Sequence, residues 1–297
     1  MTVDLRGLSV ALATPFDPRG EVDLDAFRRL CRHVEGGGAD VLVALGSTGE
    51  ANTVDDRERD DIIAACVDEA RRATVVVGCG HASTRQSCAW AARAEALGAR
   101  GALVVTPPYV KPTRAGLLAH YRAIAEAAPA LALIAYNVPS RTGQNLTPDV
   151  LAELWSIPSV VAVKESSGDL MQIGRIAAEL PSGKLLLAGD DGLALPSIAC
   201  GAQGLVSVAG NVAPRAVAEL VAAARSGEIA RARELAARLR PLMTALFVES
   251  NPIPLKAALV ELGIAGDTLR LPLTTPEPAT RRRIAQAIAA LREEVHA

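Results

Sequence analysis

Short apolar segments alternate along the chain with longer segments in which apolar residues recur at the spacing of an amphipathic helix. This alternation is typical of βα units, in which each strand is followed by a helix that packs on the sheet. The strands read as apolar on both faces, as in a parallel sheet covered by helices. We expect eight of them, at residues 8–14, 40–47, 74–80, 101–108, 131–137, 159–166, 184–190 and 204–210.

The segments between the strands carry the start signals of helices. One helix is expected after Asp23, and two more have a proline just inside the first turn, in TPDVLAEL and APRAVAEL. Eight successive βα units with right-handed crossovers predict a closed (β/α)8 barrel, the TIM barrel of the α/β class. We expect this barrel in residues 1–226. Residues 227–297 contain helical patterns and are expected to form a C-terminal helical region.

Composition narrows the class of protein. The chain has 297 residues, half of them apolar, and a formal net charge of −2, which does not favour nucleic acid as a partner. Its five cysteines are scattered without CxxC spacing, so neither a disulfide framework nor a zinc site is indicated. We expect a cytoplasmic protein without a membrane partner, because neither an export signal nor an apolar run of membrane-spanning length is present.

Catalytic residues of such barrels lie where the strands end, at the carboxyl edge of the sheet. Two of the three tyrosines, Tyr109 and Tyr136, fall at such positions. Polar motifs follow six of the eight strands: GSTGE (46–50), TPPYVKP (106–112), YNVPSRTG (136–143), KESSG (164–168), GDD (189–191) and SVAGN (207–211).

The sixth strand ends in a lysine. Alternation of side chains places Lys164 on one face with Val160 and Ala162, and Glu165 on the other, so either Lys164 or Glu165 points into the barrel mouth. Burial disfavours the ammonium form of a lysine and so supplies a neutral amine that attacks carbonyl carbon to form a Schiff base. An ion pair with a strand-end carboxylate, Asp190 or Asp191, is the alternative, and the strand alone does not choose between them.

The motifs occur in the order and spacing of a known family. From ALATPF (11–16) through NPIPLK (251–256) to LRLPLTT (269–275), the chain resembles the dihydrodipicolinate synthase family of pyruvate-dependent class I aldolases, the superfamily of N-acetylneuraminate lyase. The resemblance implies that Lys164 forms the Schiff base with pyruvate and that Tyr136 relays protons. It also implies that Ser47 and Tyr109 complete the relay, with Tyr109 supplied by a neighbouring subunit. Ser47 replaces a threonine of the family and lacks the methyl group that fixes the rotamer.

Two sets of groups are candidates for binding substrate carboxylates. The turn 46–49 can aim N–H groups and the Thr48 hydroxyl at the carboxylate of pyruvate, although an ordinary turn would look the same. Arg141 has a planar guanidinium suited to a second carboxylate, although it would also suit a surface ion pair. Gly189 and Val206, near the ends of the last two strands, complete the predicted substrate-binding set. No metal or cofactor is expected, because a protonated imine on the lysine serves as the electron sink.

Three functions fit these residues. The first is the condensation of pyruvate with L-aspartate 4-semialdehyde to give 4-hydroxy-tetrahydrodipicolinate, in lysine and diaminopimelate biosynthesis. The second is an aldolase or lyase that cleaves N-acetylneuraminate or a 2-keto-3-deoxy sugar acid, and the third is a non-catalytic barrel that binds keto acids. Arg141 favours the first over the second, because an amino acid's carboxylate calls for a cation. Lys164, Tyr136 and Tyr109 together disfavour the third.

The resemblance also bears on assembly and regulation. A tyrosine borrowed from a neighbour implies a homo-oligomer, a dimer or a dimer of dimers (a homotetramer). Some family members are inhibited by lysine bound at the dimer interface. The positions that would form this pocket lack several of the acceptors a dication needs, so we expect inhibition to be weak or absent; these positions are Ala51, Asn52, Asp56, Arg59, Ala82, Gln86 and Pro108.

Overall fold

The computed structural model describes residues 3–293 and contains a closed barrel of eight parallel strands that pair in chain order, with β8 returning to β1. The TIM barrel predicted from the sequence is therefore confirmed. Each observed strand lies within or one residue from its predicted range, and all except the fifth, which ends at Asn137 as predicted, are shorter at the carboxyl end. The strands are β1 (Gly7–Ala11), β2 (Val41–Ala44), β3 (Thr74–Gly78), β4 (Gly101–Val105), β5 (Ala132–Asn137), β6 (Val160–Glu165), β7 (Leu185–Ala188) and β8 (Gly204–Ser207).

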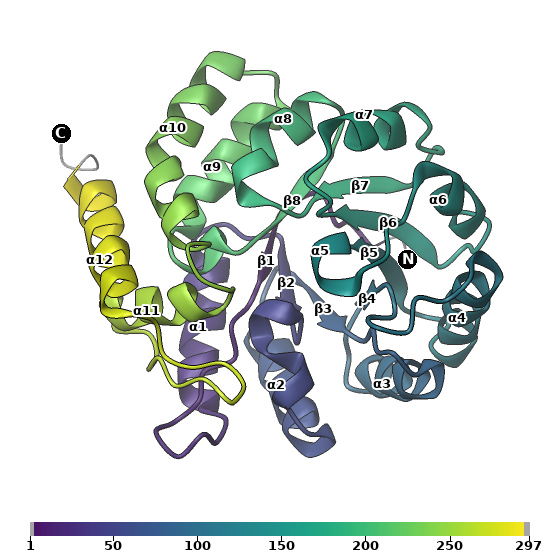
Figure 1. Ribbon diagram of the computed structural model, residues 1–297, viewed down its shortest axis with the longest axis horizontal. Helices are drawn as coiled ribbons and strands as arrows, with labels where there is room; N and C mark the ends of the chain where they lie inside the picture. The colour runs from purple at the N-terminus through teal and green to yellow at the C-terminus, as the bar shows by residue number, and fades with distance from the viewer. Residues whose placement is uncertain (1–2, 294–297) are drawn as a thin grey trace.

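Helices surround the barrel, and the last three lie together on one side of it (Figure 1). Short 3-10 turns follow β2, β7 and β8: η1 (Ser47–Gly49), η2 (Ala51–Thr53), η3 (Asp191–Leu193) and η4 (Ala209–Asn211). The α-helices are α1 (Leu24–Gly36), α2 (Asp56–Glu69), α3 (Thr84–Ala96), α4 (Arg114–Ala127), α5 (Pro139–Thr142), α6 (Pro148–Leu154), α7 (Leu170–Ala178), α8 (Ala194–Ala199), α9 (Pro214–Arg225), α10 (Ile229–Ala245), α11 (Ile253–Glu261) and α12 (Pro278–Glu293).

The start signals identified in the sequence act as expected. The Asp23 side chain accepts a hydrogen bond from the backbone N–H of Ala26 and caps α1. Helices α6 and α9 begin with Pro148 and Pro214, whose fixed φ suits a first helical position where no N–H partner is needed.

Two apolar layers make up the core. The larger lies between the outer face of the barrel and the helices, and the smaller fills the barrel itself, with residues such as Val43, Leu103 and Leu187. The prediction that Val160 shares the inner face with Ala162 and Lys164 is wrong. The pairing of β5 with β6 shifts register there, since Leu133 pairs with Val160 but the next residue pairs with Ala162. This bulge leaves Val160 in the outer layer.

The helices predicted after the barrel are present. Helix α10 packs on α9, and α12 packs on α10 and α11. The chain between α11 and α12 runs back across the loops that follow β1 and β2, where Arg270 binds the Gly20 carbonyl and Glu58. The division of the chain at residue 226 stays a prediction. Among the described helices, none has the length and apolar character needed to cross a membrane.

Candidate active site

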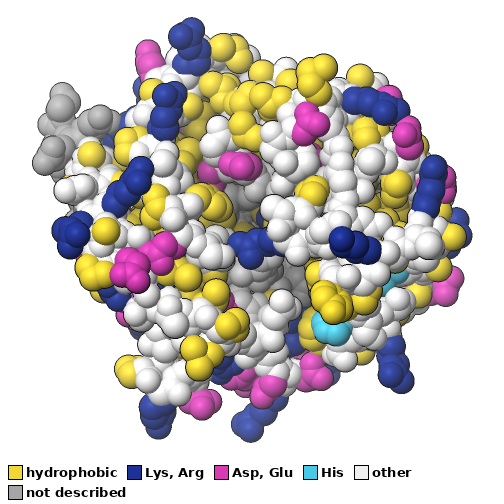
Figure 2. Space-filling model, in the orientation of Figure 1, with side chains coloured by type: hydrophobic (Ala, Val, Ile, Leu, Met, Phe, Trp, Pro, Cys, Tyr) yellow, Lys and Arg dark blue, Asp and Glu magenta, His cyan; other side chains and the backbone are white. Residues whose placement is uncertain are grey.

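A pocket of about 660 Å³ opens beyond the carboxyl ends of β2 to β5. Figure 2 shows a hollow near the centre of one face of the molecule. Four of the predicted site residues line the pocket: Ser47, Tyr109, Tyr136 and Arg141. The C-terminal region forms its far wall. The other lining residues are Leu45, Gly46, Glu50, Ala51, Asn52, Thr53, Gly78, Gly80, His81, Ala82, Leu103, Val105, Pro108, Val138, Thr142, Ser250, Asn251, Pro272 and Leu273.

Lys164 lies next to Tyr136, which belongs to the pocket wall. The two residues pair across the neighbouring strands β5 and β6, and the Lys164 Nζ atom lies 4.3 Å from the centre of the Tyr136 ring. Because Tyr136 belongs to the apolar layer inside the barrel, Lys164 is the inward-pointing residue of the pair Lys164 and Glu165. Lys164 is only 6% exposed, and within residues 3–293 it makes no ion pair. The ion-pair alternative considered for this lysine therefore has no support in the structure.

Glu165 belongs to a polar network on the outer side of the same strands. Its Oε2 atom accepts a hydrogen bond from the Asn137 amide (2.8 Å), and its Oε1 atom accepts from the backbone N–H of Ser167 (2.7 Å). Asn137 in turn accepts from the backbone N–H of Leu146 (2.8 Å). Each of these buried groups thus has a partner directly behind Tyr136 and Lys164. The sequence contained both residues within its motifs, but nothing in the pattern indicated that they bind each other.

Gly189 and Val206, predicted to bind substrate, lie deeper than the pocket wall. A Cβ atom on Gly189 would lie 1.9 Å from Ser166 Oγ and 3.0 Å from Lys164 Cε, so this position admits only glycine beside the lysine. Val206 is buried inside the barrel on β8. Neither residue lines the pocket.

Asp191 serves the backbone of the neighbouring loop. Its carboxylate accepts hydrogen bonds from the Ser207 hydroxyl and from the backbone N–H groups of Val208 and Ala209, both at 2.9 Å. Burial raises the pKa of this carboxyl group. Asp190 accepts from the backbone N–H of Gly192. These contacts agree with leaving both aspartates out of the predicted site.

Thr48 is held by a residue of the C-terminal region. It is 4% exposed, and its Oγ1 atom accepts a hydrogen bond from the Asn251 amide (2.9 Å). The backbone carbonyl of Asn251 accepts from the Arg141 guanidinium (3.2 Å). Thr48 Oγ1 accepts this bond, so its own hydroxyl hydrogen is left to donate, but Thr48 is not among the residues that line the pocket. Asn251 thus contacts both predicted carboxylate-binding residues, a role that its NPIPLK motif did not indicate.

Tyr109 projects away from its own chain. Its side chain is 94% exposed, although it stands at the pocket rim, and its backbone φ is 71°. In the described part of the chain, four residues other than glycine have a left-handed φ: Leu45, Glu50, Tyr109 and Lys111. All four lie in the loops after β2 and β4. Strained backbone therefore concentrates at this pocket, as is common at functional sites.

The seven positions expected to form a lysine pocket do not lie together, and Gln86, in the first turn of α3, does not line the pocket described above. Ala51, Asn52, Ala82 and Pro108 line the pocket described above. Asp56 and Arg59 instead contact the side chain of Trp90, and none of these three residues lines the pocket. The Asp56 carboxylate accepts from the Trp90 indole N–H (2.8 Å). The buried Arg59 lies 3.8 Å from the Trp90 ring and donates to the Gly78 carbonyl (2.6 Å).

Comparisons with known proteins cover nearly the whole chain. The model of the dihydrodipicolinate synthetase family matches residues 4–291. The 4-hydroxy-tetrahydrodipicolinate synthase of Methylococcus capsulatus is 42% identical over 286 residues, 96% of this chain and 98% of that protein. The chloride-inhibited dihydrodipicolinate synthase of Acinetobacter baumannii, solved in complex with pyruvate, superposes with a TM-score of 0.94 at 37% identity, covering 97% of this chain and 99% of that chain. The enzyme of Cyanidioschyzon merolae, solved with lysine bound, gives a TM-score of 0.93 at 35% identity, covering 97% and 98%.

Proposed function

The chain belongs to the dihydrodipicolinate synthetase family and has 4-hydroxy-tetrahydrodipicolinate synthase activity, and we propose that it catalyses this reaction through a Schiff base between pyruvate and Lys164. The observation that carries the proposal is the position of Lys164. It is a buried lysine at the carboxyl end of a barrel strand, against the ring of a tyrosine that lines the pocket. An amine at this position is placed to attack the carbonyl carbon of a keto acid bound in the pocket.

The lysine supplies the electron sink for carbon–carbon bond formation. The amine adds to C2 of pyruvate, and loss of water gives a protonated imine. Removal of a proton from C3 then gives an enamine, whose C3 attacks the aldehyde carbon of aspartate semialdehyde. The imine nitrogen takes up the electron pair when C3 loses its proton and returns it when C3 attacks the aldehyde. The amino group that came with the aldehyde then adds to C2, and the Lys164 amine leaves as the ring closes.

Proton transfers in these steps are assigned to Tyr136, Ser47 and Tyr109. The Tyr136 ring lies against the Lys164 amine, and Tyr136 shares the pocket wall with Ser47. A hydroxyl held within hydrogen-bonding range of the reacting atoms acts as a general acid and base. Tyr109 is exposed in the single chain, which suits a phenol that enters the pocket of a second copy.

The two carboxylates of the substrates are assigned to different walls of the pocket. The turn 46–49 with the Thr48 hydroxyl faces the carboxylate of pyruvate, and Arg141 at the rim faces that of aspartate semialdehyde. Asn251 forms hydrogen bonds with both Thr48 and Arg141, so a single residue connects the two carboxylate-binding groups.

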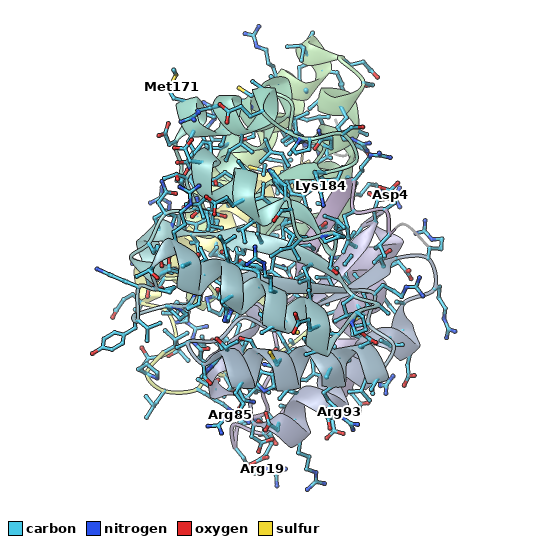
Figure 3. The ribbon with its side chains drawn as sticks, turned by 90° about the vertical axis from the view of Figure 1, so that its right-hand side faces the viewer. Asp4, Arg19, Arg85, Arg93, Met171 and Lys184 are labelled. Atoms are coloured by element: carbon cyan, nitrogen blue, oxygen red, sulfur yellow. The ribbon has the colours of Figure 1, made fainter. Side chains whose placement is uncertain are left out.

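Trapping with borohydride tests the lysine, because the chain has only four lysines. Incubation with pyruvate and borohydride should attach a reduced pyruvyl group to Lys164 alone, and Lys164→Ala should abolish labelling and turnover. Lys184 donates to the carbonyls of Pro158 and Val160 at the opposite end of the barrel, where Figure 3 shows it beside Asp4 and far from Met171. Lys256 is fully buried. A label on Lys111, Lys184 or Lys256 would overturn the assignment.

The second substrate is tested separately. A coupled assay should show turnover of pyruvate with aspartate semialdehyde and little cleavage of N-acetylneuraminate or 2-keto-3-deoxy sugar acids. Arg141→Ala should raise KM for aspartate semialdehyde much more than KM for pyruvate. Efficient cleavage of a sugar acid by the wild-type enzyme would contradict the assignment of Arg141.

A further inference from the structure

A buried ion pair that the reaction does not use lies behind the turn 46–49. Lys256 Nζ is 2.5 Å from Glu50 Oε1, and the two side chains are 0% and 1% exposed. Lys256 also donates to the Thr268 carbonyl (2.7 Å), and its ammonium lies 4.0 Å from the centre of the Phe16 ring. Two charges taken out of water are costly unless each is paired and hydrogen-bonded, so a pair of this kind calls for an explanation beyond stability.

The backbone on each side of the turn is strained. Leu45 and Glu50 bracket residues 46–49 and both have a left-handed φ, of 58° and 51°. Side chains other than glycine adopt this conformation at a cost, and it persists only where the surroundings impose it. At the carboxyl end of the turn, the contacts that hold this backbone conformation are made by the side chain of Glu50.

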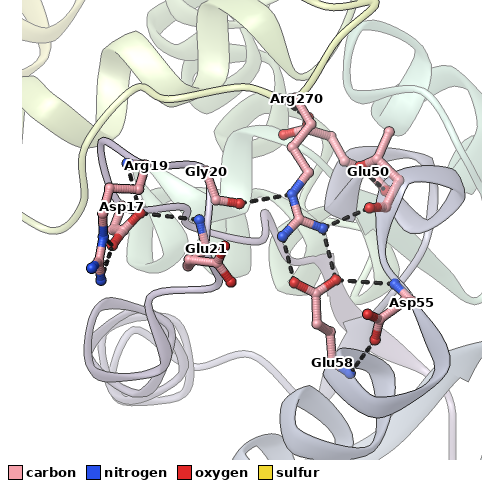
Figure 4. Close-up of polar contacts among 9 residues, drawn as sticks. Asp17, Arg19, Gly20, Glu21, Glu50, Asp55, Glu58 and Arg270 are labelled. Carbon is pink, nitrogen blue, oxygen red and sulfur yellow. Dashed lines mark hydrogen bonds and ion pairs between the residues drawn. The ribbon is translucent and has the colours of Figure 1, made fainter.

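Arg270 holds the other oxygen of the same carboxylate. Its backbone N–H donates to Glu50 Oε2 (3.1 Å). Its guanidinium binds Glu58 on α2, the Thr53 carbonyl (2.6 Å) and the Gly20 carbonyl (2.8 Å), as Figure 4 shows in part. Glu50 is therefore clamped between Lys256 of α11 and the chain that precedes α12.

We propose that Glu50 and Lys256 are positioning residues for the reaction, which fix the turn 46–49 so that Ser47 and Thr48 face the bound pyruvate. The inference rests on the roles assigned above to Ser47 and Thr48. Neither Glu50 nor Lys256 has to touch the reacting atoms. The ion pair holds the backbone of Glu50 in its left-handed conformation, and this fixes the turn 46–49. The C-terminal region thereby controls the position of a barrel loop.

Three variants separate positioning from stability. Glu50→Gln and Lys256→Met each leave a buried group without its ionic partner, and both should lower the melting temperature. The double variant leaves no unpaired charge and frees the Thr268 carbonyl for the new amide. We expect its melting temperature to recover most of the loss, while kcat stays at least tenfold below wild type and KM for pyruvate at least fivefold above it. Leu259→Ala, a buried position on the same helix, is the control that lowers stability but should leave kcat within twofold.

Several outcomes would overturn the inference. One is activity that returns in the double variant together with stability, and another is a loss of kcat in Leu259→Ala that matches the loss in Glu50→Gln. Should the three variants fail to fold, Glu50→Asp keeps the charge but draws the carboxylate back from Lys256 Nζ and from the Arg270 N–H, and an unchanged KM for pyruvate in this variant would refute the proposal. Borohydride trapping on the wild-type enzyme keeps the two proposals apart. If Lys164 is labelled but the variants keep their kcat and KM, only the positioning role is refuted. If Lys164 is not labelled, the proposed Schiff-base mechanism is refuted.

Discussion

Asn137 and Glu165 face each other one residue beyond Tyr136 and Lys164, and the Asn137 amide donates to the Glu165 carboxylate across 2.8 Å. The hydrogen bond joins the ends of two neighbouring strands on the side away from the pocket. Since consecutive side chains of a strand point to opposite faces, fixing this outer pair also fixes the inner pair, the amine and the phenol of the proposed mechanism. The outer pair therefore determines how Lys164 and Tyr136 lie relative to each other.

Asn137→Ala should damage both stability and catalysis. It leaves the Glu165 carboxylate and the Leu146 N–H without their buried partner, which should cost about 1–3 kcal/mol in the free energy of unfolding. We also expect kcat to fall at least tenfold, measured in the coupled assay beside urea unfolding. Asn145→Ala is the matched control, because Asn145 contacts the same network from an exposed position and should change both quantities less. Equal effects of the two substitutions would contradict this role.

Tyr109→Phe should lower kcat by about tenfold or more and change KM for pyruvate little, because the proposed mechanism uses its hydroxyl to relay protons and not to bind substrate. Tyr121→Phe is the control. The Tyr121 hydroxyl donates to the Val104 carbonyl inside the core, so removing it loses a buried hydrogen bond and should lower stability without a comparable loss of kcat. Sedimentation should show at least a dimer at assay concentration. A fully active monomer would refute the shared site.

Asn251→Ala should separate the two substrates. The substitution removes the amide that binds Thr48 but keeps the backbone carbonyl that binds Arg141. KM for pyruvate should therefore rise more than KM for aspartate semialdehyde, the reverse of the pattern expected for Arg141→Ala. Measuring both constants for both variants checks the assignment. Parallel changes in the two constants would show that Asn251 acts on the pocket as a whole.

L-Lysine should inhibit weakly or not at all at physiological concentrations. Ala82 and Pro108 line the pocket but have no side-chain acceptor for a dication, and loss of a charge-assisted contact costs about 1–2 kcal/mol. A titration with L-lysine in the coupled assay gives the answer. The double variant Ala82→Asn with Gln86→Glu should increase sensitivity, whereas strong cooperative inhibition of the wild-type enzyme would mean that other residues bind the dication.

Acid should destabilise the enzyme through His120. Burial lowers the pKa of this imidazole to about 4, below the ordinary value of 6.5. Between pH 6.5 and pH 4 the unfolded chain takes up a proton at His120 that the folded chain does not. The free energy of unfolding therefore keeps its full value above pH 6.5 and decreases as the pH falls towards 4. The loss should reach about 3 kcal/mol. Urea unfolding from pH 7 to pH 4 measures it, and His120→Gln should flatten the profile. An equally steep profile in that variant would assign the effect to other groups.

Local patterns were sufficient to predict the barrel. Each strand and each proline-started helix depends on residues close in sequence, and the observed elements match them. Alternation failed at Val160, because the bulge between β5 and β6 changes which residue faces inward, and no feature of the sequence indicates that bulge. For the same reason the choice between Lys164 and Glu165 stayed open until the strand pairing was known.

Site residues on the strand ends were predictable, and their supports were not. Ser47, Tyr136 and Arg141 line the pocket because every strand of a parallel barrel ends at the same edge. Asn251, Lys256 and Arg270 act through partners about 200 positions earlier in the chain, as the separation of 203 residues between Asn251 and Thr48 shows. Patterns within a short stretch of sequence do not reveal contacts between residues that are so far apart in the chain.

These long separations also set the order in which the enzyme becomes competent while it is synthesised. Strand β8 ends at Ser207, so the barrel has all its strands and both Lys164 and Tyr136 before the clamp on Glu50 has been translated. Ribosomes add about 5–20 residues per second, and Arg270 follows Ser207 only after several more seconds. During that interval a nascent chain has Lys164 and Tyr136 but lacks the pocket wall from Ser250 to Leu273. The pocket is therefore complete only after the C-terminal region has packed against the loop that follows β2.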